Sequence, residues 1–445
     1  MKRFVMIMIS LALILNVSLV FASGSGQQGG KTVIRVAHFY DGASGASAQM
    51  ALDWLNKLKA EFERENPNVV VEWEMMQWDQ IDVKIISDFR SNITAHDVTF
   101  TSPQLFPLHS EVGDLEDLNP YIKRDWSAAR LGEVSWASTY QQGLQNGKQI
   151  AIPLGSHARV LIWNKDHFTA AGLDPNKPPK TMEELIAYAQ KLTIDKNGDG
   201  VIDQYGFGTT LAPNRGTIEL SFGPLLWGLG GDLIDPATKA AVFADSKGVQ
   251  VAEQIWDMVN TYKILPPDAV TTTYDVGEYF YSERVSMSFG WGHYFLDGLQ
   301  SKGWVRGLSP PRPDAQLVKV GVAQYPTPTE ANFTNSWAIS IYQKSQNKEL
   351  AWKFIDTMLK SNLNEYPDAG LPIKQTEWQK PEYQTEYYKT YYRAIETGKP
   401  MPQTPYFGEL ADTVAAALQR CISAPKSDIP RILREAQQEY NSKSR

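Results

Sequence analysis

Residues Asp195–Asp203 form the most regular oxygen-rich pattern in this sequence, Asp-Lys-Asn-Gly-Asp-Gly-Val-Ile-Asp. Oxygen-bearing side chains occupy its first, third, fifth and ninth positions, a glycine the sixth, and a residue that offers its carbonyl oxygen the seventh. This spacing predicts a loop that holds a structural Ca²⁺ through Asp195, Asn197, Asp199, Val201 and Asp203. The bidentate glutamate expected at the twelfth position is replaced by Gly206, so a plain Asx/glycine turn is the alternative. Calcium here would brace the fold, and we expect no required cofactor.

Covalent catalysis has little support in the sequence. Cys421 is the single cysteine, which excludes a disulfide within the chain and disfavours a cysteine-based metal cluster or nucleophile. Glycoside hydrolysis needs two carboxylates that flank one bond, and no motif supplies such a pair. We therefore expect a protein that is not an enzyme, with a secreted glycan-acting enzyme as the distant alternative.

Other residues are suited to binding an uncharged molecule rich in hydroxyl groups. The 13 Trp and 20 Tyr exceed what a core needs, and aromatic rings stack on the C–H faces of sugars. Planar polar side chains complement hydroxyl groups, which both donate and accept hydrogen bonds. Ligands of α/β proteins lie beyond the carboxyl ends of strands. The candidates that follow strand-like segments are Asp41, Ser102, Gln104, Trp227, Trp291, His293 and Trp337.

Alternating strands and helices would position these residues. Predicted strands cover 33–37, 69–71, 98–100, 150–153 and 160–163; predicted helices cover 50–62, 79–90, 249–261, 348–361, 382–397 and 409–423. Thr181 and Glu184 form a capping box that predicts the start of a further helix. The alternation favours an α/β fold with mainly parallel sheets.

The first residues predict export from the cytoplasm. Lys2 and Arg3 precede an apolar run from Phe4 to Phe21, which is typical of a signal peptide over residues 1–22, followed by a polar linker over 23–30. A membrane anchor is the alternative. No cysteine follows to accept a lipid, so we expect a secreted protein in the periplasm or cell-surface space that is not lipid-anchored. The net charge of −7 and the absence of a basic patch argue against a nucleic-acid partner.

Several segments together resemble the family 1 extracellular solute-binding proteins, the maltodextrin-binding type of receptor for ABC importers. The matching segments are Phe62–Val69, Leu115–Ile122, Gly147–Pro153, Ile162–Asp166, Trp227–Leu233, Val285–Trp291 and Asn347–Ile355. The chain departs from the family pattern at His96, at Ser282–Arg284 and at Asn335–Trp337, where the family has a Gly-Gly loop. These changes weaken the transfer of any particular sugar.

The resemblance implies two α/β lobes joined by hinge segments, with a sugar in the cleft between them and a permease as partner. It implies an N-terminal lobe of residues 31–156 and 324–370 and a C-terminal lobe of residues 157–323 and 371–445. Crossings between the lobes are expected near 155–159, 323–326 and 369–372. The family pattern adds His157 and Tyr406 to the ligand-binding candidates, and Asn335, which departs from the family pattern in a loop near the ligand, is a further candidate. We expect a monomer.

The same fold could bind another class of solute. Iron would need clustered tyrosines, and the pairs Tyr387-Tyr388 and Tyr391-Tyr392 are available, although helical spacing favours packing for them. An organic acid would need arginine in the cleft, where Arg159 and Arg215 are the candidates. A polyamine would need several acidic residues there. The sequence favours a mono- or oligosaccharide.

Overall fold

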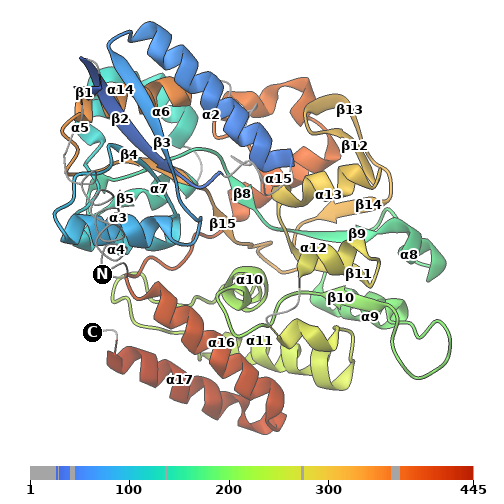
Figure 1. Ribbon diagram of the computed structural model, residues 1–445. Coiled ribbons are helices and arrows are strands. Elements are labelled where there is room, and N and C mark those ends of the chain that lie inside the picture. Colours follow the sequence, from blue (N-terminus) through green and yellow to red (C-terminus); the bar gives the residue numbers. More distant parts are fainter. Residues whose placement is uncertain are drawn as a thin grey trace, which may run out of the picture.

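The computed structural model describes residues 27–28, 30–40, 46–135, 138–271, 275–361 and 371–443. They form two lobes, each with its own sheet and its own buried core, which lie side by side in Figure 1. The predicted signal peptide, residues 1–22, lies outside the described residues. The two-lobe α/β fold agrees with the sequence-based prediction.

The sheet of the N-terminal lobe is built on β2, a strand rich in β-branched residues. Parallel partners flank β2, while β16 and β7 extend the sheet in antiparallel fashion. Its strands are β1 (Gln27–Gln28), β2 (Lys31–His38), β3 (Val69–Met75), β4 (Val98–Thr101), β7 (Ile152–Pro153) and β16 (Ala338–Ile341). Because every residue of β4 is buried, the sheet must be covered on both faces.

Helices cover this sheet with apolar stripes at helical spacing. In the late helix α14, Trp352, Ile355 and Leu359 are buried, and Phe354 meets Phe62 of α2 edge to face, with the ring centroids 5.2 Å apart. The helices of the lobe are α2 (Ala46–Glu65), α3 (Ile81–Arg90), α4 (Phe106–Val112), α5 (Asn119–Asp125), α6 (Ala128–Ser135), α7 (Ser138–Gln142) and α14 (Lys348–Lys360). A short 3-10 turn, η1 (Pro103–Leu105), follows β4.

The second sheet has the strand order β10-β11-β9-β14. Its strands are β9 (Val160–Asn164), β10 (Tyr205–Gly208), β11 (Val285–Trp291) and β14 (Val320–Ala323). All residues of β9 and β11 are buried, as expected for strands covered on both faces. A two-stranded hairpin, β12 (Val305–Leu308) and β13 (Pro311–Leu317), stands beside this sheet.

The prediction of mainly parallel sheets needs correction. Among the described strands of the second sheet, only β10 and β11 pair in parallel, whereas β9 pairs antiparallel with both β11 and β14. The chain enters this lobe along β9 and leaves it along β14, and it leaves the other lobe along β7 and returns along β16. In each lobe, the strand on which the chain enters runs antiparallel to the neighbouring strand on which it leaves. Each sheet therefore contains both parallel and antiparallel pairs.

The C-terminal lobe is covered mainly by helices. They are α8 (Lys165–Ala170), α9 (Met182–Leu192), the π-helical turns η2 (Ile218–Phe222) and η3 (Asp257–Thr261), α10 (Gly223–Gly228), α11 (Ser246–Trp256), α12 (Val276–Tyr281), α13 (Leu296–Ser301), α15 (Glu386–Thr397), α16 (Phe407–Ser423) and α17 (Ile429–Lys443). The Thr181 hydroxyl accepts a hydrogen bond from the Glu184 N–H (3.2 Å) and caps α9 as predicted. The Glu184 carboxylate accepts from the N–H of Lys180 (2.7 Å), one residue earlier than the capping box predicts.

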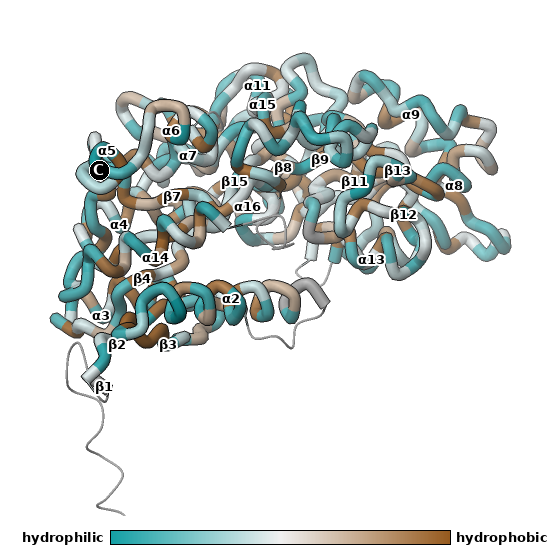
Figure 2. The backbone as a smooth tube through the Cα atoms, turned by 90° about the horizontal axis from the view of Figure 1, so that it is seen from above, coloured by the Kyte–Doolittle hydropathy of each residue, from teal (hydrophilic) through white to brown (hydrophobic). Residues whose placement is uncertain are grey.

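Three segments of the chain lie side by side between the lobes. The short strands β8 (His157–Ala158) and β15 (Thr334–Asn335) pair antiparallel, and Ser156 exchanges two backbone hydrogen bonds with Leu371. Figures 1 and 2 both show β8 and β15 between the two groups of strands. The predicted boundary at residue 324 is too early, because Tyr325 and Phe333 pack in the core of the C-terminal lobe. The chain crosses at β15 instead.

Candidate functional site

The junction between the lobes is the candidate site, because the segments that join the lobes and several predicted residues meet there. His157 and Asn335 face each other in the β8–β15 pair. His157 is buried, while Asn335 is half-buried and its amide oxygen has no hydrogen-bond partner among the described residues. An oxygen left in this way can accept a hydrogen bond from a bound molecule.

An aromatic–cation contact joins the two lobes. Trp78 lies in the loop that follows β3 of the N-terminal lobe, and half of its surface is exposed. The guanidinium of Arg215, just before η2 of the C-terminal lobe, lies 5.2 Å from the centroid of the Trp78 ring. Cation–π contacts of this kind are attractive, so Trp78 and Arg215 hold the lobes near each other.

Arg215 also pairs with an acidic side chain beside this contact. Its Nε lies 3.4 Å from Oε1 of Glu219 on η2. Burial raises the pKa of Glu219, and the positive charges of Arg215 and Arg159 oppose that rise. Arg159 itself is buried directly after β8. Two guanidinium groups therefore lie near one carboxyl group on this side of the junction.

Aromatic residues gather at the carboxyl end of β2. The rings of Phe39 and Trp337 lie 4.1 Å apart between centroids and are both half-buried. His38, the last residue of β2, is buried, which lowers its pKa to about 4. Its Nδ1 accepts from the N–H of Tyr40 (3.1 Å), so the ring proton is on Nε2, which has no partner within the described part of the chain.

Ser102, at the end of β4, belongs to a buried hydrogen-bond network. Its hydroxyl donates to Asp82 (2.5 Å), whose other oxygen accepts from Nε2 of His109 (3.0 Å). Nδ1 of His109 donates to Asp114 (2.9 Å). The donor capacity of the Ser102 hydroxyl is thus used inside the lobe. Gln104 follows on η1 and is half-buried.

Trp227 and Trp291 lie in the core of the C-terminal lobe, although both were predicted to bind ligand. Trp227 is 2% exposed, and its Nε1 donates to Asp232 (3.2 Å). Trp291 is fully buried, and the Phe295 ring stacks on it with the centroids 4.6 Å apart. Side chains that cover these rings leave little free aromatic face for a ligand, so the geometry does not favour the predicted role.

The remaining described candidates, His293 and Tyr406, lie on separate segments of the C-terminal lobe. His293 is buried, and its Nδ1 lies 3.0 Å from the hydroxyl of Tyr387; burial lowers its pKa to about 4. Tyr406 is 41% exposed at the start of α16. Asp41 lies outside the described residues. The structure thus brings His157, Asn335 and Trp337 to the junction region and places Trp227, Trp291 and His293 in the core.

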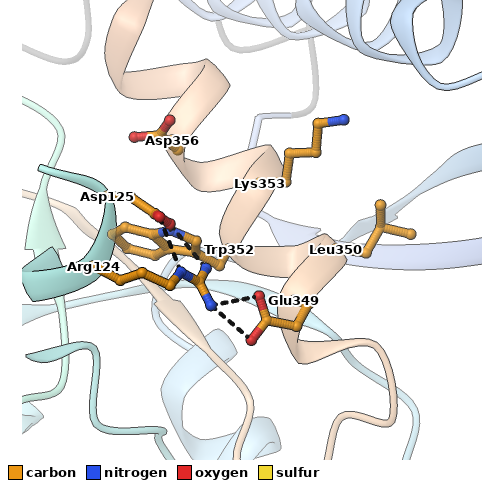
Figure 3. Close-up of a pocket in the computed structure, with 7 residues that line it drawn as sticks. All are labelled: Arg124, Asp125, Glu349, Leu350, Trp352, Lys353 and Asp356. Carbon is orange, nitrogen blue, oxygen red and sulfur yellow. Dashed lines mark hydrogen bonds and ion pairs between the residues drawn. The ribbon is translucent and has the colours of Figure 1, made fainter. Parts of the chain in front are cut away.

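The cavity drawn in Figure 3 lies elsewhere, on the surface of the N-terminal lobe between α5 and α14. It has a volume of about 470 Å³. Arg124 pairs there with Asp125 (2.8 Å) and Glu349 (3.0 Å), and Nε1 of Trp352 donates to Asp125 (2.7 Å). Because these groups bind one another and none of them is a predicted site residue, we do not assign this cavity as the functional site.

Sequence comparison identifies the family. The pattern described as bacterial extracellular solute-binding protein matches residues 48–361, which is more than half of the chain. The chain belongs to this family of solute-binding proteins.

Curated relatives agree on the family and differ in their names. A relative from Brucella abortus (strain 2308), named as a binding protein, is 24% identical over 402 residues, which cover 86% of this chain and 88% of the relative. A relative from Sinorhizobium fredii, named as an amino-acid ABC transporter periplasmic-binding protein, is 24% identical over 315 residues. The match covers 70% of this chain and 66% of the relative.

Solved structures share the fold. The ABC substrate-binding protein of Listeria monocytogenes in complex with cycloalternan has a TM-score of 0.73 at 20% identity and covers 93% of this chain and 99% of its own. A solute-binding protein from Thermotoga lettingae bound with α-D-tagatose has a TM-score of 0.73 at 22% identity, with coverage of 92% and 98%. At these identities the similarity establishes the two-lobe fold alone.

A solute-binding protein of this extracellular family acts outside the cytoplasm and supplies an ABC permease with a small molecule. In the described part of the chain, none of the helices combines the length and the apolar composition that crossing a bilayer requires.

The predicted calcium loop of this solute-binding protein is closed by its own backbone. Asp195 accepts from the N–H groups of Gly198 (2.7 Å) and Gly200 (2.8 Å), and these bonds lower its pKa. Asp203 accepts from the N–H of Lys196 (2.7 Å). Among the described residues, no group of three or more His, Cys, Asp or Glu side chains is arranged to hold a metal ion. The Asx/glycine turn accounts for this geometry, and calcium binding stays a prediction.

The sequence-based selection missed several residues at the junction. Trp78 follows the strand β3, so the same rule about carboxyl ends of strands could have selected it. Arg215 was considered only for an anionic ligand, and its contact with Trp78 depends on segments far apart in the sequence. Gln142, at the end of α7, is buried with both amide atoms unpartnered within the described residues, and no motif marks it.

Proposed function

We propose that this solute-binding protein captures a carbohydrate between its two lobes and delivers it to an ABC-type importer. One observation carries the proposal: partly exposed aromatic rings, and neutral amides with atoms that lack a hydrogen-bond partner among the described residues, belong to segments that border the junction of the lobes. Trp78 and Trp337 supply the rings, and Gln142 and Asn335 supply the amides. Rings can cover the C–H faces of a sugar, and amides can bind its hydroxyl groups.

The tyrosines considered for iron have other roles. The hydroxyl of Tyr388 donates to the carbonyl of Leu308, and that of Tyr391 donates to the carbonyl of Trp291 (3.0 Å). Burial raises the pKa of Tyr387 and Tyr388 well above 10, which disfavours the phenolate that iron requires. These contacts favour packing of α15 over metal binding.

Of the two cations considered for an anionic solute, Arg215 is already engaged with other groups. The guanidinium of Arg215 is engaged with the Trp78 ring and with Glu219. A bound carboxylate or phosphate would have to compete with Glu219 for this cation. A polyamine would have to compete with the same guanidinium for Glu219. A neutral solute leaves the pair intact.

Our proposal assigns binding and release alone to this chain, without chemical change of the solute. We also propose that the chain works as a monomer, that residues 1–22 direct its export, and that it is not lipid-anchored. Lobes joined by three neighbouring segments can close on a solute by hinge motion, which gives a permease two states to distinguish.

The test uses protein purified after secretion from the full-length gene. Thermal unfolding and tryptophan fluorescence are measured with maltose, maltotriose, cycloalternan, tagatose and ribitol, and with glycine, succinate, spermidine and ferric citrate as non-sugar solutes. A solute at a hundred times its Kd adds about 2.7 kcal/mol to the free energy of unfolding. A shift with a sugar or polyol, recovered unchanged after incubation, supports the proposal. A shift with only a non-sugar solute refutes the carbohydrate assignment, and hydrolysis of the sugar refutes the binding-only role.

A further inference from the structure

Gln142 has a buried side-chain amide that destabilises the folded state to an unusual extent. It is the last residue of α7, and only 3% of its surface is exposed. Within the part of the chain that the structure describes, neither its amide oxygen nor its amide nitrogen has a hydrogen-bond partner. A buried polar group without a partner costs about 1–3 kcal/mol, so such groups are rare unless they serve another purpose.

A second buried glutamine nearby shows the ordinary arrangement. Gln149 is 1% exposed, and its amide nitrogen donates to the carbonyls of Ala151 (2.7 Å) and Tyr140 (3.2 Å). The lobe is therefore able to satisfy a buried glutamine amide. The amide of Gln142 differs from that of Gln149 in that neither of its atoms has such a partner among the described residues.

That position is the junction of the lobes. The helix α7 packs beside β15, and the hydroxyl of Thr139 on α7 lies 3.4 Å from that of Ser156 in the first crossing segment. The backbone carbonyl of Gln142 accepts from the side chain of Gln145 (2.8 Å). The same side-chain nitrogen of Gln145 donates to Gln403 of the C-terminal lobe (2.7 Å).

The neighbouring strand β15 supplies a matching group. The amide oxygen of Asn335 also lacks a partner within the described residues. Gln142 thus offers an amide NH2 group as donor and an amide oxygen as acceptor, and Asn335 offers a further acceptor oxygen. A hydroxyl group both donates and accepts, so two neighbouring hydroxyls of a sugar ring complement this set of atoms.

We propose that Gln142, together with Asn335, recognises neighbouring hydroxyl groups of the bound solute and determines specificity among sugars. This inference rests on the proposed function. Sugar binding satisfies the amide of Gln142 and removes the cost of its burial. A deoxy analogue that lacks one of the two hydroxyls leaves an amide atom unpaired and binds more weakly.

The test compares Gln142→Met with Gln149→Met in the full-length secreted protein. Methionine has a similar volume and no hydrogen-bonding amide. Without added solute, Gln142→Met should keep or raise the melting temperature, because it removes a buried amide that has no partner in the described part of the chain. Gln149→Met should lower it, because it removes two hydrogen bonds. For a sugar of the panel that the wild type binds, Gln142→Met should raise Kd roughly 10–100-fold.

The outcomes separate this inference from the proposed function. If the wild type binds a sugar and Gln142→Met binds it equally well, the role of Gln142 is refuted and the carbohydrate assignment stands. A fall in melting temperature of Gln142→Met as large as that of Gln149→Met would show a structural role and refute the inference. If the wild type binds no sugar or polyol of the panel, the proposed function fails first and this inference fails with it.

Discussion

His109 should make the stability of the N-terminal lobe depend on pH at the alkaline side. Both of its ring nitrogens lie within 3.0 Å of carboxylate oxygens, Nε2 at Asp82 and Nδ1 at Asp114. A carboxylate can only accept, so both nitrogens carry protons and the ring is a buried imidazolium. Burial alone would lower the pKa of His109, but the two carboxylates raise it to about 9.

The magnitude follows from the difference between the folded and unfolded pKa. The unfolded pKa is about 6.5, and a shift to about 9 corresponds to about 3 kcal/mol of stability. Because the folded pKa is the higher one, this contribution is complete below pH 6.5. It is lost as the pH rises through 9.

The assay is urea unfolding of the wild type and of His109→Gln at intervals between pH 6 and pH 10. Amide exchange of peptides from β4 and α4 reports the N-terminal lobe separately, which matters because the two lobes have separate cores. The difference in free energy of unfolding between the two proteins should be about 3 kcal/mol larger at pH 6 than at pH 10.

His293→Gln is the matched control. Burial lowers the pKa of His293 to about 4, so its contribution is present above pH 6.5 and is lost as the pH falls towards 4. The effect of His293→Gln should therefore be constant between pH 7 and pH 10. A constant effect of His109→Gln over the same range would show that the ring is not a buried cation.

Three further predictions concern the lobe contacts and the predicted calcium loop. Trp78→Ala removes the contact with Arg215 and should weaken binding of a panel sugar by roughly 2–5-fold, as measured by calorimetry; unchanged affinity would mean that the contact does not favour the bound state. Gln403→Ala removes the hydrogen bond that Gln145 donates across the lobes, and we expect the affinity for the panel sugar to fall roughly 2–10-fold. An increase in this affinity would contradict a role of the Gln145–Gln403 bond in holding the lobes together. Millimolar Ca²⁺ should raise the melting temperature of the wild type but not of Asp199→Ala, and equal responses of the two proteins would leave the Asx/glycine turn as the whole explanation.

Local sequence patterns were sufficient to predict most helices and strands and the fold class. The helix predicted over 348–361 is α14 (Lys348–Lys360), and the strand predicted over 160–163 is β9 (Val160–Asn164). The Thr181 cap was equally visible, because a cap depends on residues within one turn. Sheet direction was predicted less well, since it depends on how the chain passes between the lobes.

The candidate site, like the fold, could be predicted only in part from the sequence. The sequence placed His157, Asn335 and Trp337 near the crossing segments by resemblance to the family, and the structure brings them to the junction region. It could not distinguish an aromatic ring available to a ligand from one that is covered. Trp291 is covered by Phe295, and its backbone carbonyl accepts from Tyr391, far away in the chain.

The sequence by itself determined that this chain is a two-lobe solute-binding protein, because hydrophobic periodicity, caps and family motifs are local and survive without tertiary contacts. Only the tertiary structure decided which groups are free to bind. Exposure and hydrogen bonding depend on segments that meet across the fold, as Trp78 meets Arg215. For the same reason Gln142, which no motif marks, has an amide at the junction of the lobes that lacks a partner among the described residues.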